Sequence, residues 1–306
     1  MTENESEVSE IVHKPVLLQE VLDMLHPVPG QCFIDATANG GGHTFALWER
    51  VKPHGTILAI DKDNDLVLRL AAEARERKAN VIAVCGSYGE LTAIASAHDI
   101  PQVDGILFDL GYSSYHIDRS GRGFSFQKDE PLLMRYEPEG YVQEGMTAAE
   151  AVNQLPEQEL ADIIYRYGED RLARRIASVI CSERKKERIL TTKQLADIIA
   201  QAYPKRAFSR INPATKTFQA LRIFVNQELR ELEKALPQAR DIVKKGGTIA
   251  VITFHSLEDR IVKRFLQSEK NNHLDIITKK PIVPTVKETS ENRRARSAKL
   301  RVAVKK

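Results

Sequence analysis

Three acidic side chains stand where short apolar runs of this 306-residue sequence end, and a glycine loop follows the first of them. The acids are Asp35, Asp61 and Asp109, and the loop spans residues 40–42, immediately before His43. Apolar runs bounded by glycine are typical of buried parallel strands, and ligands of such sheets lie at the carboxyl ends of the strands. We therefore expect the three acids and the loop to surround one ligand site.

Asp61 indicates which ligand this is. It ends the second predicted strand about 20 residues after the loop, where a carboxylate can accept hydrogen bonds from both ribose hydroxyls of an adenine nucleoside. NAD and S-adenosylmethionine (SAM) both carry that ribose, but a dinucleotide loop normally has the spacing GxGxxG, which the segment 39–43 lacks. SAM has no phosphate, and backbone N–H groups and nearby acids can hold its carboxylate and ammonium groups. The loop therefore favours SAM, with a dinucleotide cofactor as the alternative.

Other side chains near these strand ends could take part, and each also has a purely structural explanation. Tyr88, after the third strand, could stack on adenine or pack in the core, and His43 could bind the ligand or cap a helix. Asp109 and Ser113, in the segment FDLGYSS, could accept the hydrogens of an exocyclic base amine and so favour its attack on the sulfonium methyl group. A plain turn explains the same segment, and Asp35 could equally cap a helix.

The elements that must position these side chains alternate between strand and helix patterns. Strands are predicted at 32–35, 56–61, 79–84 and 103–110, and helices at 16–25, 44–51, 63–78 and after residue 86. This alternation predicts a parallel, doubly wound α/β sheet. A fifth strand at 248–254, followed by a helix whose capping box is Ser256 and Asp259, and two strands near 276–278 and 300–304 extend the same fold.

The alternation stops after Leu110. Residues 111–139 show no sustained period, whereas 147–203 have helical spacing and include a capping box at Thr191. One long helix is predicted from Pro213 to Leu236, with a polar face expected to be solvated. We therefore expect a discontinuous α/β core of residues 1–114 and 213–306 and a helical insert of residues 115–212.

Composition and charge narrow the class of protein. The 42% apolar content supports a sizeable core, and no apolar run reaches the roughly 18 residues of a membrane span. The three cysteines form no metal-type pair, so we expect no metal site and a reducing, cytoplasmic location. The acidic N-terminus does not resemble a secretory signal and is expected to fray.

Basic residues cluster locally on a chain whose net charge is only +3. One cluster lies in 281–306, and the other in 201–216 comprises Lys205, Arg206, Arg210 and Lys216. Such clusters suggest a polyanion partner contacted at selected places, and ordinary surface charge is the alternative.

Taken together, these segments resemble the RsmH (MraW) family of bacterial 16S ribosomal RNA cytosine-N4-methyltransferases. The matching stretches run in order along the chain: HKPVLLQEVL (13–22), DATANGGGHT (35–44), DKD (61–63), FDLGYSS (108–114), RGFSF (122–126), PATKTFQALRIFVN (213–226), FHSLEDRIVKRF (254–265) and RARSAKLRV (294–302). The resemblance implies a class I SAM-dependent methyltransferase with a helical insert that recognises RNA. Its implied target is a cytosine of the decoding centre, next to the P site of the 30S subunit.

Residues of the family site are carried over position by position. The resemblance implies SAM contacts at Gly41, Gly42, His43, Asp61, Tyr88, Asp109 and, at a position where the family has glutamine, His116. The chain departs from the family pattern at Asn39, His116, Leu133 and Asn212, which bears on RNA docking and rate. Two alternatives therefore stay open: a methyltransferase of another substrate, and a non-catalytic factor that binds RNA of the small subunit.

Overall fold

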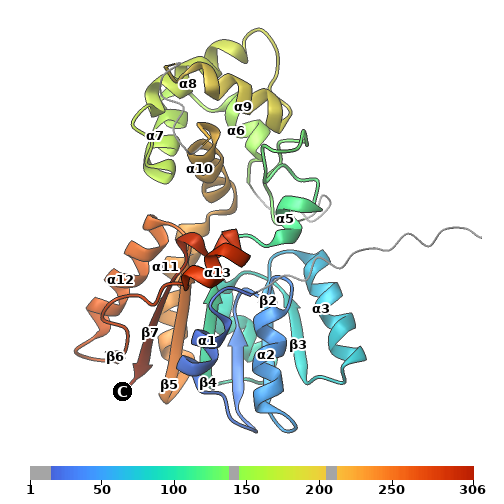
Figure 1. Cartoon of the computed structure of the whole chain (residues 1–306), viewed down its shortest axis with the longest axis vertical. Coiled ribbons are helices and arrows are strands. Elements are labelled where there is room, and N and C mark those ends of the chain that lie inside the picture. Colours follow the sequence, from blue (N-terminus) through green and yellow to red (C-terminus); the bar gives the residue numbers. More distant parts are fainter. Residues whose placement is uncertain (1–14, 138–144, 205–211) are drawn as a thin grey trace, which may run out of the picture.

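The computed structural model describes residues 15–137, 145–204 and 212–306. Figure 1 shows an α/β lobe built from both ends of the chain and a helical lobe above it. The acidic N-terminal residues and the cluster formed by Lys205, Arg206 and Arg210 lie outside the described residues.

A seven-stranded sheet organises the α/β lobe, with strand order β3-β2-β1-β4-β5-β7-β6. The strands are β1 (Cys32–Asp35), β2 (Thr56–Asp61), β3 (Val81–Cys85), β4 (Val103–Asp109), β5 (Val243–Thr253), β6 (Leu274–Ile276) and β7 (Lys299–Lys305). Strands β1 to β5 pair in parallel, and β7 lies antiparallel between β5 and β6. The predicted Rossmann-like fold is thereby confirmed. Because the strand order reverses between β1 and β4, their carboxyl ends form the switch point at which such sheets bind ligands.

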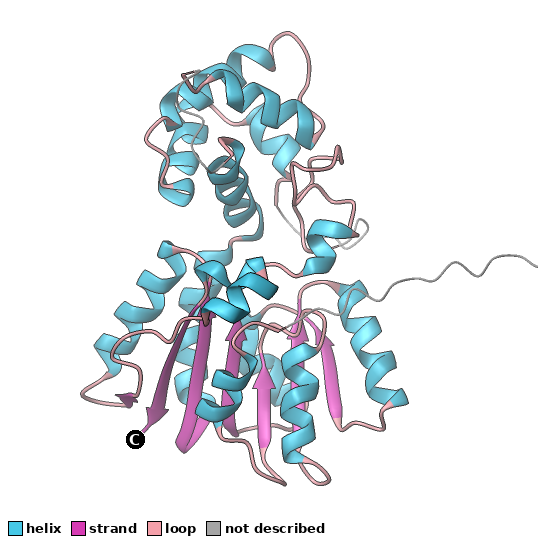
Figure 2. Ribbon diagram, in the orientation of Figure 1, coloured by secondary structure: helices cyan, strands magenta, loops and turns pink. Residues whose placement is uncertain are grey.

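Helices cover both faces of this sheet, as Figure 2 shows. The helices of this lobe are α1 (Leu18–Leu25), α2 (Gly42–Val51), α3 (Asn64–Glu76), the 3₁₀ helix η1 (Tyr88–Glu90), α4 (Leu91–Ala97), α11 (Glu228–Ile242), α12 (Ser256–Glu269), α13 (Val286–Glu291) and the 3₁₀ helix η2 (Arg293–Ser297). Helices α4, α11 and α12 pack on one face, and α1 and α2 on the other.

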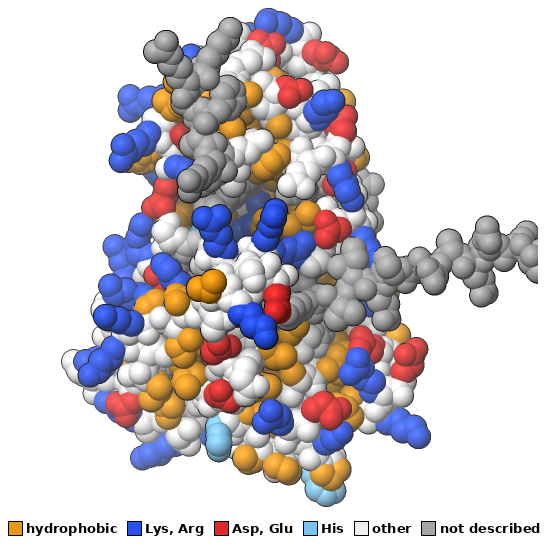
Figure 3. Space-filling model, in the orientation of Figure 1, with side chains coloured by type: hydrophobic (Ala, Val, Ile, Leu, Met, Phe, Trp, Pro, Cys, Tyr) orange, Lys and Arg blue, Asp and Glu red, His pale blue; other side chains and the backbone are white. Residues whose placement is uncertain are grey.

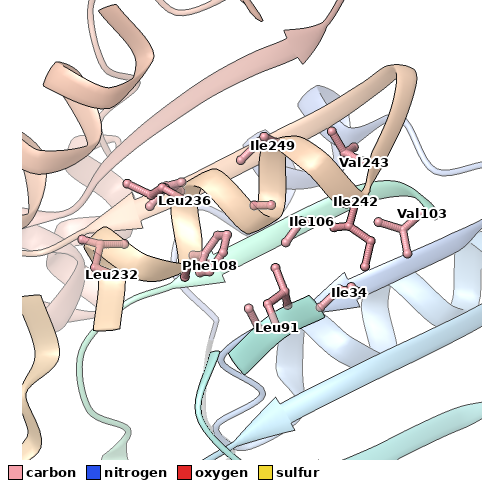
Figure 4. Close-up of a cluster of buried hydrophobic side chains, with 14 of the residues drawn as sticks. Ile34, Leu91, Val103, Ile106, Phe108, Leu232, Leu236, Ile242, Val243 and Ile249 are labelled. Atoms are coloured by element: carbon pink, nitrogen blue, oxygen red, sulfur yellow. The ribbon is translucent and has the colours of Figure 1, made fainter. Parts of the chain in front are cut away.

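Helix α11 shows how its sequence determines this packing. Leu232, Leu236 and Ile242 recur at helical spacing and are buried against Phe108 and Ile106 of β4, as Figure 4 shows. Burying each such side chain contributes about 1.5–3 kcal/mol. The sheet edge that carries the site is therefore held on a rigid core.

The helical lobe has a separate hydrophobic core. Its helices are α5 (Ser114–Asp118) at the base, then α6 (Ala148–Gln154), α7 (Glu157–Gly168), α8 (Ala173–Glu183), α9 (Thr192–Gln201) and α10 (Ala214–Asn226). Helix α10 places Ala214, Phe218 and Leu221 in this core, so the helical cluster includes residues beyond 212. The capping box at Thr191 is confirmed, whereas α5 lies in the segment predicted to lack periodicity, because five residues are too few to show one.

The single long helix predicted from 213 to 236 is wrong. Gln227 has φ 51°, in the left-handed region, and separates α10 from α11. Tertiary contacts hold the break, since Asn226 donates from Nδ2 to the Met134 carbonyl at 2.7 Å and accepts from the Tyr136 N–H at 3.1 Å. The apolar spacing continues through the break and therefore hides it.

Candidate active site

A crevice opens at the carboxyl ends of β1, β2 and β4. Its lining includes Thr37, Asn39, Asp61, Tyr88, His116 and Tyr136. We call it the switch-point crevice. It lies where the fold predicts a ligand, and the helical side of the chain closes it through Tyr136.

Asp61 is fixed at this crevice by backbone donors. Its Oδ2 accepts from the Asn39 N–H at 2.7 Å, and its Oδ1 accepts from the Asp63 N–H at 2.9 Å. Burial raises the pKa of Asp61 above its ordinary value, and these two bonds oppose the shift. Each oxygen keeps a further lone pair, so the carboxyl can accept two more hydrogen bonds from a ligand.

Tyr88 begins η1 and also lines the crevice. Its ring meets Phe108 edge to face, with centroids 5.9 Å apart, and its hydroxyl donates to the Glu228 carbonyl at 3.3 Å. Both suggested roles are therefore compatible with its position, because the ring packs on the core and still borders the crevice.

His116 lines the crevice too, but the chain engages both of its ring nitrogens. Nδ1 accepts from the Ser113 N–H at 3.1 Å, which leaves the proton on Nε2, 3.0 Å from Oδ2 of Asp63. Ser113 is buried and holds the start of α5 in this capping box. Both residues therefore support the wall of the site.

The glycine loop is placed differently from the other predicted contacts. Gly41 has φ +79° as the N-cap of α2, and a Cβ there would lie 2.8 Å from Leu70 Cδ1, so glycine is required. Gly41 and Gly42 line a cavity between α2 and α3, which we call the α2–α3 cavity. Ser113 lines that cavity as well, and Asn39 lines both it and the switch-point crevice.

Asp109 borders a third hollow, which we call the Asp109 cleft. Its lining includes Asn39, Gly111, Tyr112, Arg222, His255 and Arg293. Oδ2 of Asp109 lies 3.6 Å from His43 Nε2, whereas Oδ1 is buried and has no hydrogen-bond partner among the described residues. Burial raises the pKa of Asp109 well above its ordinary value, and the nearby charges of Asp35 and Glu258 raise it further.

Asp35 lies behind this cleft as a structural acid. Its Oδ2 accepts from the Thr44 hydroxyl at 2.7 Å and its Oδ1 from the Thr37 N–H at 3.3 Å. Burial raises the pKa of Asp35 to about 6. The carboxyl thus ties the end of β1 to the first turn of α2.

A buried ion pair that the sequence did not reveal lies between the crevice and the cleft. Arg222 donates from Nε and Nη2 to the two carboxylate oxygens of Glu228 at 2.8 and 2.9 Å, and the Tyr136 hydroxyl donates to Glu228 Oε1 at 3.0 Å. The guanidinium lies 4.4 Å from the ring centre of Tyr112. The polar face of this helix comprises Thr215, Gln219, Arg222 and Asn226. The prediction that it is solvated is wrong for Arg222 and Asn226, which are buried, whereas Thr215 is exposed. The only indication in the sequence that Arg222 and Asn226 are buried is that each directly follows an apolar residue of the helical repeat, Leu221 and Val225.

The turn into α12 is capped one residue earlier than predicted. His255 is the N-cap, and its Nδ1 accepts from the Glu258 N–H at 3.4 Å. Glu258 accepts in return from the Phe254 and His255 N–H groups at 2.8 and 3.3 Å. The predicted box of Ser256 and Asp259 is wrong, because Asp259 instead binds Arg301 at 2.6 Å.

Glu228, His255 and Glu258 bring one possible metal-ligand atom each to within 4.8 Å of one another. Both carboxylates are already engaged, Glu228 by Arg222 and Tyr136, and Glu258 by backbone N–H groups. These bonds hold the carboxylates in the protein's own network. A metal ion there would have to displace them.

The RGFSF segment alternates arginine and aromatic residues, as loops that stack on RNA bases do, but its aromatic rings pack on other aromatic rings of the protein. Phe124 stacks on Tyr136 at 5.3 Å, and Phe126 meets Phe218 at 5.2 Å. Arg122 is buried and binds Asp63 at 2.8 Å. Basic side chains lie instead between the two lobes near α13, where Figure 3 shows several together.

Within the described part of the chain, no helix combines the length and apolar character needed to cross a membrane.

Comparison with known proteins gives close relatives over nearly the whole chain. The chain is 45% identical over 295 residues to "Ribosomal RNA small subunit methyltransferase H" of Persephonella marina, covering 96% of this chain and 99% of that protein. It is 47% identical over 302 residues to the protein of the same name from Deinococcus radiodurans, covering 98% of this chain and 92% of that protein. The model of the MraW methylase family matches residues 10–306, and the chain therefore belongs to this family.

Proposed function

We propose that this protein is a SAM-dependent methyltransferase of small-subunit ribosomal RNA, and that it methylates N4 of a cytosine in the decoding centre, near the P site. Family membership and the names of the relatives support the reaction class. The observation that carries the proposal is Asp61, whose two oxygens are oriented by backbone N–H groups at the edge of a crevice at the switch point. Acting on ribosomal RNA would place the protein in the cytoplasm.

The residues of the switch-point crevice would hold the nucleoside part of SAM. Asp61 would accept hydrogen bonds from the ribose hydroxyls, and Tyr88 would border the adenine. For Gly41, Gly42 and His43 to contact the ligand, its methionine part must extend past Asn39 toward the N-terminus of α2, where backbone N–H groups favour a carboxylate.

Asp109 would act on the acceptor side. When bound, SAM supplies an electrophilic methyl group. The amine nitrogen would form its bond to the methyl carbon as the sulfur–carbon bond breaks, without a covalent enzyme intermediate, and one amine proton would then leave. A buried carboxylate oxygen beside the amine would orient it and favour that loss.

The helical lobe and the basic segment 281–306 would bind the RNA, with the insert of 115–212 as the recognition domain. Arg294 shows how the two parts meet, since its Nη2 lies 3.1 Å from Asp118 of α5. An RNA bound along this junction would contact both lobes.

Methyl transfer from radiolabelled SAM to 30S subunits that lack the modification tests the proposal, with free nucleosides as the comparison and mass spectrometry of the RNA to locate the product. We expect incorporation at one cytosine of the subunit and none into nucleosides. A SAM titration by calorimetry should show binding that Asp61→Ala abolishes. Binding of subunits without SAM uptake would instead favour the non-catalytic alternative, and methylation of another substrate would favour the other one.

A further inference from the structure

The Asp109 cleft and the switch-point crevice are separate hollows that share a wall. Asn39, Leu110 and Gly111 line both, whereas Asp61 and Tyr88 line only the crevice and Asp109 only the cleft. If the nucleoside of SAM occupies the crevice, as in the proposed function on which this inference rests, the cleft faces the opposite side of the same wall. A methyl acceptor must approach from such a side for in-line displacement.

The cleft presents an acceptor that the protein leaves unused. Oδ1 of Asp109 is buried without a hydrogen-bond partner among the described residues, although its neighbour Oδ2 faces His43. Buried polar atoms are usually paired, because an unpaired one costs free energy of the order of 1–3 kcal/mol. An atom left in this state beside a cleft is suited to a ligand donor.

Two donors line the same cleft. Arg222 uses Nε and Nη2 for Glu228, so Nη1 is the nitrogen left for a ligand. His255 accepts at Nδ1 from the Glu258 N–H, which places its proton on Nε2, and this nitrogen lies 3.0 Å from Glu258 Oε1 without hydrogen-bond geometry. The cleft thus combines one acceptor with two donors.

We propose that the Asp109 cleft binds one unstacked cytosine of the RNA and distinguishes it from uracil by this pattern. The pairing edge of cytosine offers an amine donor followed by two acceptors, N3 and O2, which complement Asp109, Arg222 and His255. Uracil carries an oxygen in place of the amine and a proton on N3. It would therefore place an acceptor against Asp109 and a donor against the donor that pairs with N3 of cytosine. Recognition of a base extruded from its stack is the general solution for enzymes that modify bases.

Arg293 would bind the phosphate beside this cytosine. It lies in η2 at the cleft, is exposed, and forms no ion pair among the described residues. Its neighbour Arg294 also lines the cleft but is engaged by Asp118 and Ser114. Arg296 belongs to the same 3₁₀ helix, is exposed as well, and does not line the cleft. It provides a matched control.

The base contact is tested with Asp109→Asn, which retains size and removes the charge. We expect single-turnover methylation of 30S subunits to fall at least 100-fold while SAM affinity, measured by calorimetry, changes less than threefold. Unaltered circular dichroism and melting would establish folding. Loss of SAM affinity in parallel with rate would overturn the assignment of Asp109 to the acceptor, and a misfolded variant is replaced by Asp109→Glu, for which the same split between rate and affinity is expected.

The phosphate contact is tested by sedimentation binding of 30S subunits at several salt concentrations, which needs no activity. Arg293→Ala should weaken binding roughly tenfold and reduce the salt slope by about one, because one phosphate contact is lost. Arg296→Ala, outside the cleft, should have a clearly smaller effect on both quantities. Equal effects of the two variants would overturn the phosphate assignment. Failure of the wild-type protein to bind SAM or to methylate subunits would overturn the proposed function instead.

Discussion

Replacing Glu228 with glutamine should destabilise the protein far more than the loss of an ordinary ion pair. The side chains of Arg222 and Glu228 are 9% and 8% exposed, and three hydrogen bonds of 2.8 to 3.0 Å satisfy the carboxylate. Glutamine keeps the shape of this group but removes its charge. The guanidinium would then be buried beside a neutral amide, because Arg222 stays protonated.

The expected loss is about 3–5 kcal/mol in the free energy of unfolding, the typical cost of removing one partner of a buried pair. Urea unfolding followed by circular dichroism measures it, provided that the slope of the transition is unchanged. Glu183→Gln is the matched control, since its partner Lys186 is 68% exposed and a surface pair contributes about 0–1 kcal/mol.

A second variant separates the buried charge from lost packing. Arg222→Met combined with Glu228→Leu removes both charges and fills similar volume, so it should be more stable than Glu228→Gln alone. A cost of less than about 1 kcal/mol for Glu228→Gln, like that of the surface control, would contradict this expectation, because the pair would then be hydrated in solution.

Three further predictions concern acids and a loop. Burial raises the pKa of Asp35 from 3.8 to about 6, so the contribution of this carboxyl to stability is complete below pH 4 and is lost as the pH rises through 6. The difference in unfolding free energy between wild type and Asp35→Asn should therefore shrink by about 3 kcal/mol from pH 4 to 7, as measured by urea titrations. Asp109 must be ionised to accept a proton, so the methylation rate should rise with pH through its raised pKa, and Asp109→Asn should remove this dependence in a pH–rate profile. Gly123 has φ +77°, and a Cβ there would lie 2.3 Å from the Pro131 carbonyl oxygen, whereas Gly121, at φ +65°, has open space around it. Gly123→Ala should therefore lower the melting temperature clearly more than Gly121→Ala. Equal shifts would contradict the clash.

The sheet and its acids could be predicted because their signals are local. A short apolar run followed by glycine defines a buried strand, and parallel strands bring their carboxyl ends to one edge whatever the intervening sequence is. The sequence alone therefore places Asp61 and Asp109 at the same edge. It does not predict that they line different hollows, because the side of a loop that an acid faces depends on the turn geometry at Asn39 and Gly111.

The break at Gln227 and the buried pair beside it could not be predicted, because their causes are tertiary. A glutamine in the left-handed region has no sequence signature, and it is held by the bonds between Asn226 and the segment 134–136. Arg222 has the composition of a surface residue, and only Glu228, beyond the break, makes its burial favourable. Similarly, His255 is not a preferred N-cap residue, and Glu258 completes its capping box.

Asn39 explains why the glycine loop matters although Gly41 and Gly42 lie away from the crevice. Its backbone N–H orients Asp61, and its Nδ2 donates to the Thr37 carbonyl at 3.0 Å and to the Asp109 carbonyl at 3.4 Å. With φ 48° it takes a left-handed conformation that glycine adopts readily, and it adds a side chain that glycine lacks. Asn39 lines both the crevice and the cleft, so in the proposed mechanism the methyl group would pass beside it. Leu133 and Asn212, in contrast, lie outside the two hollows.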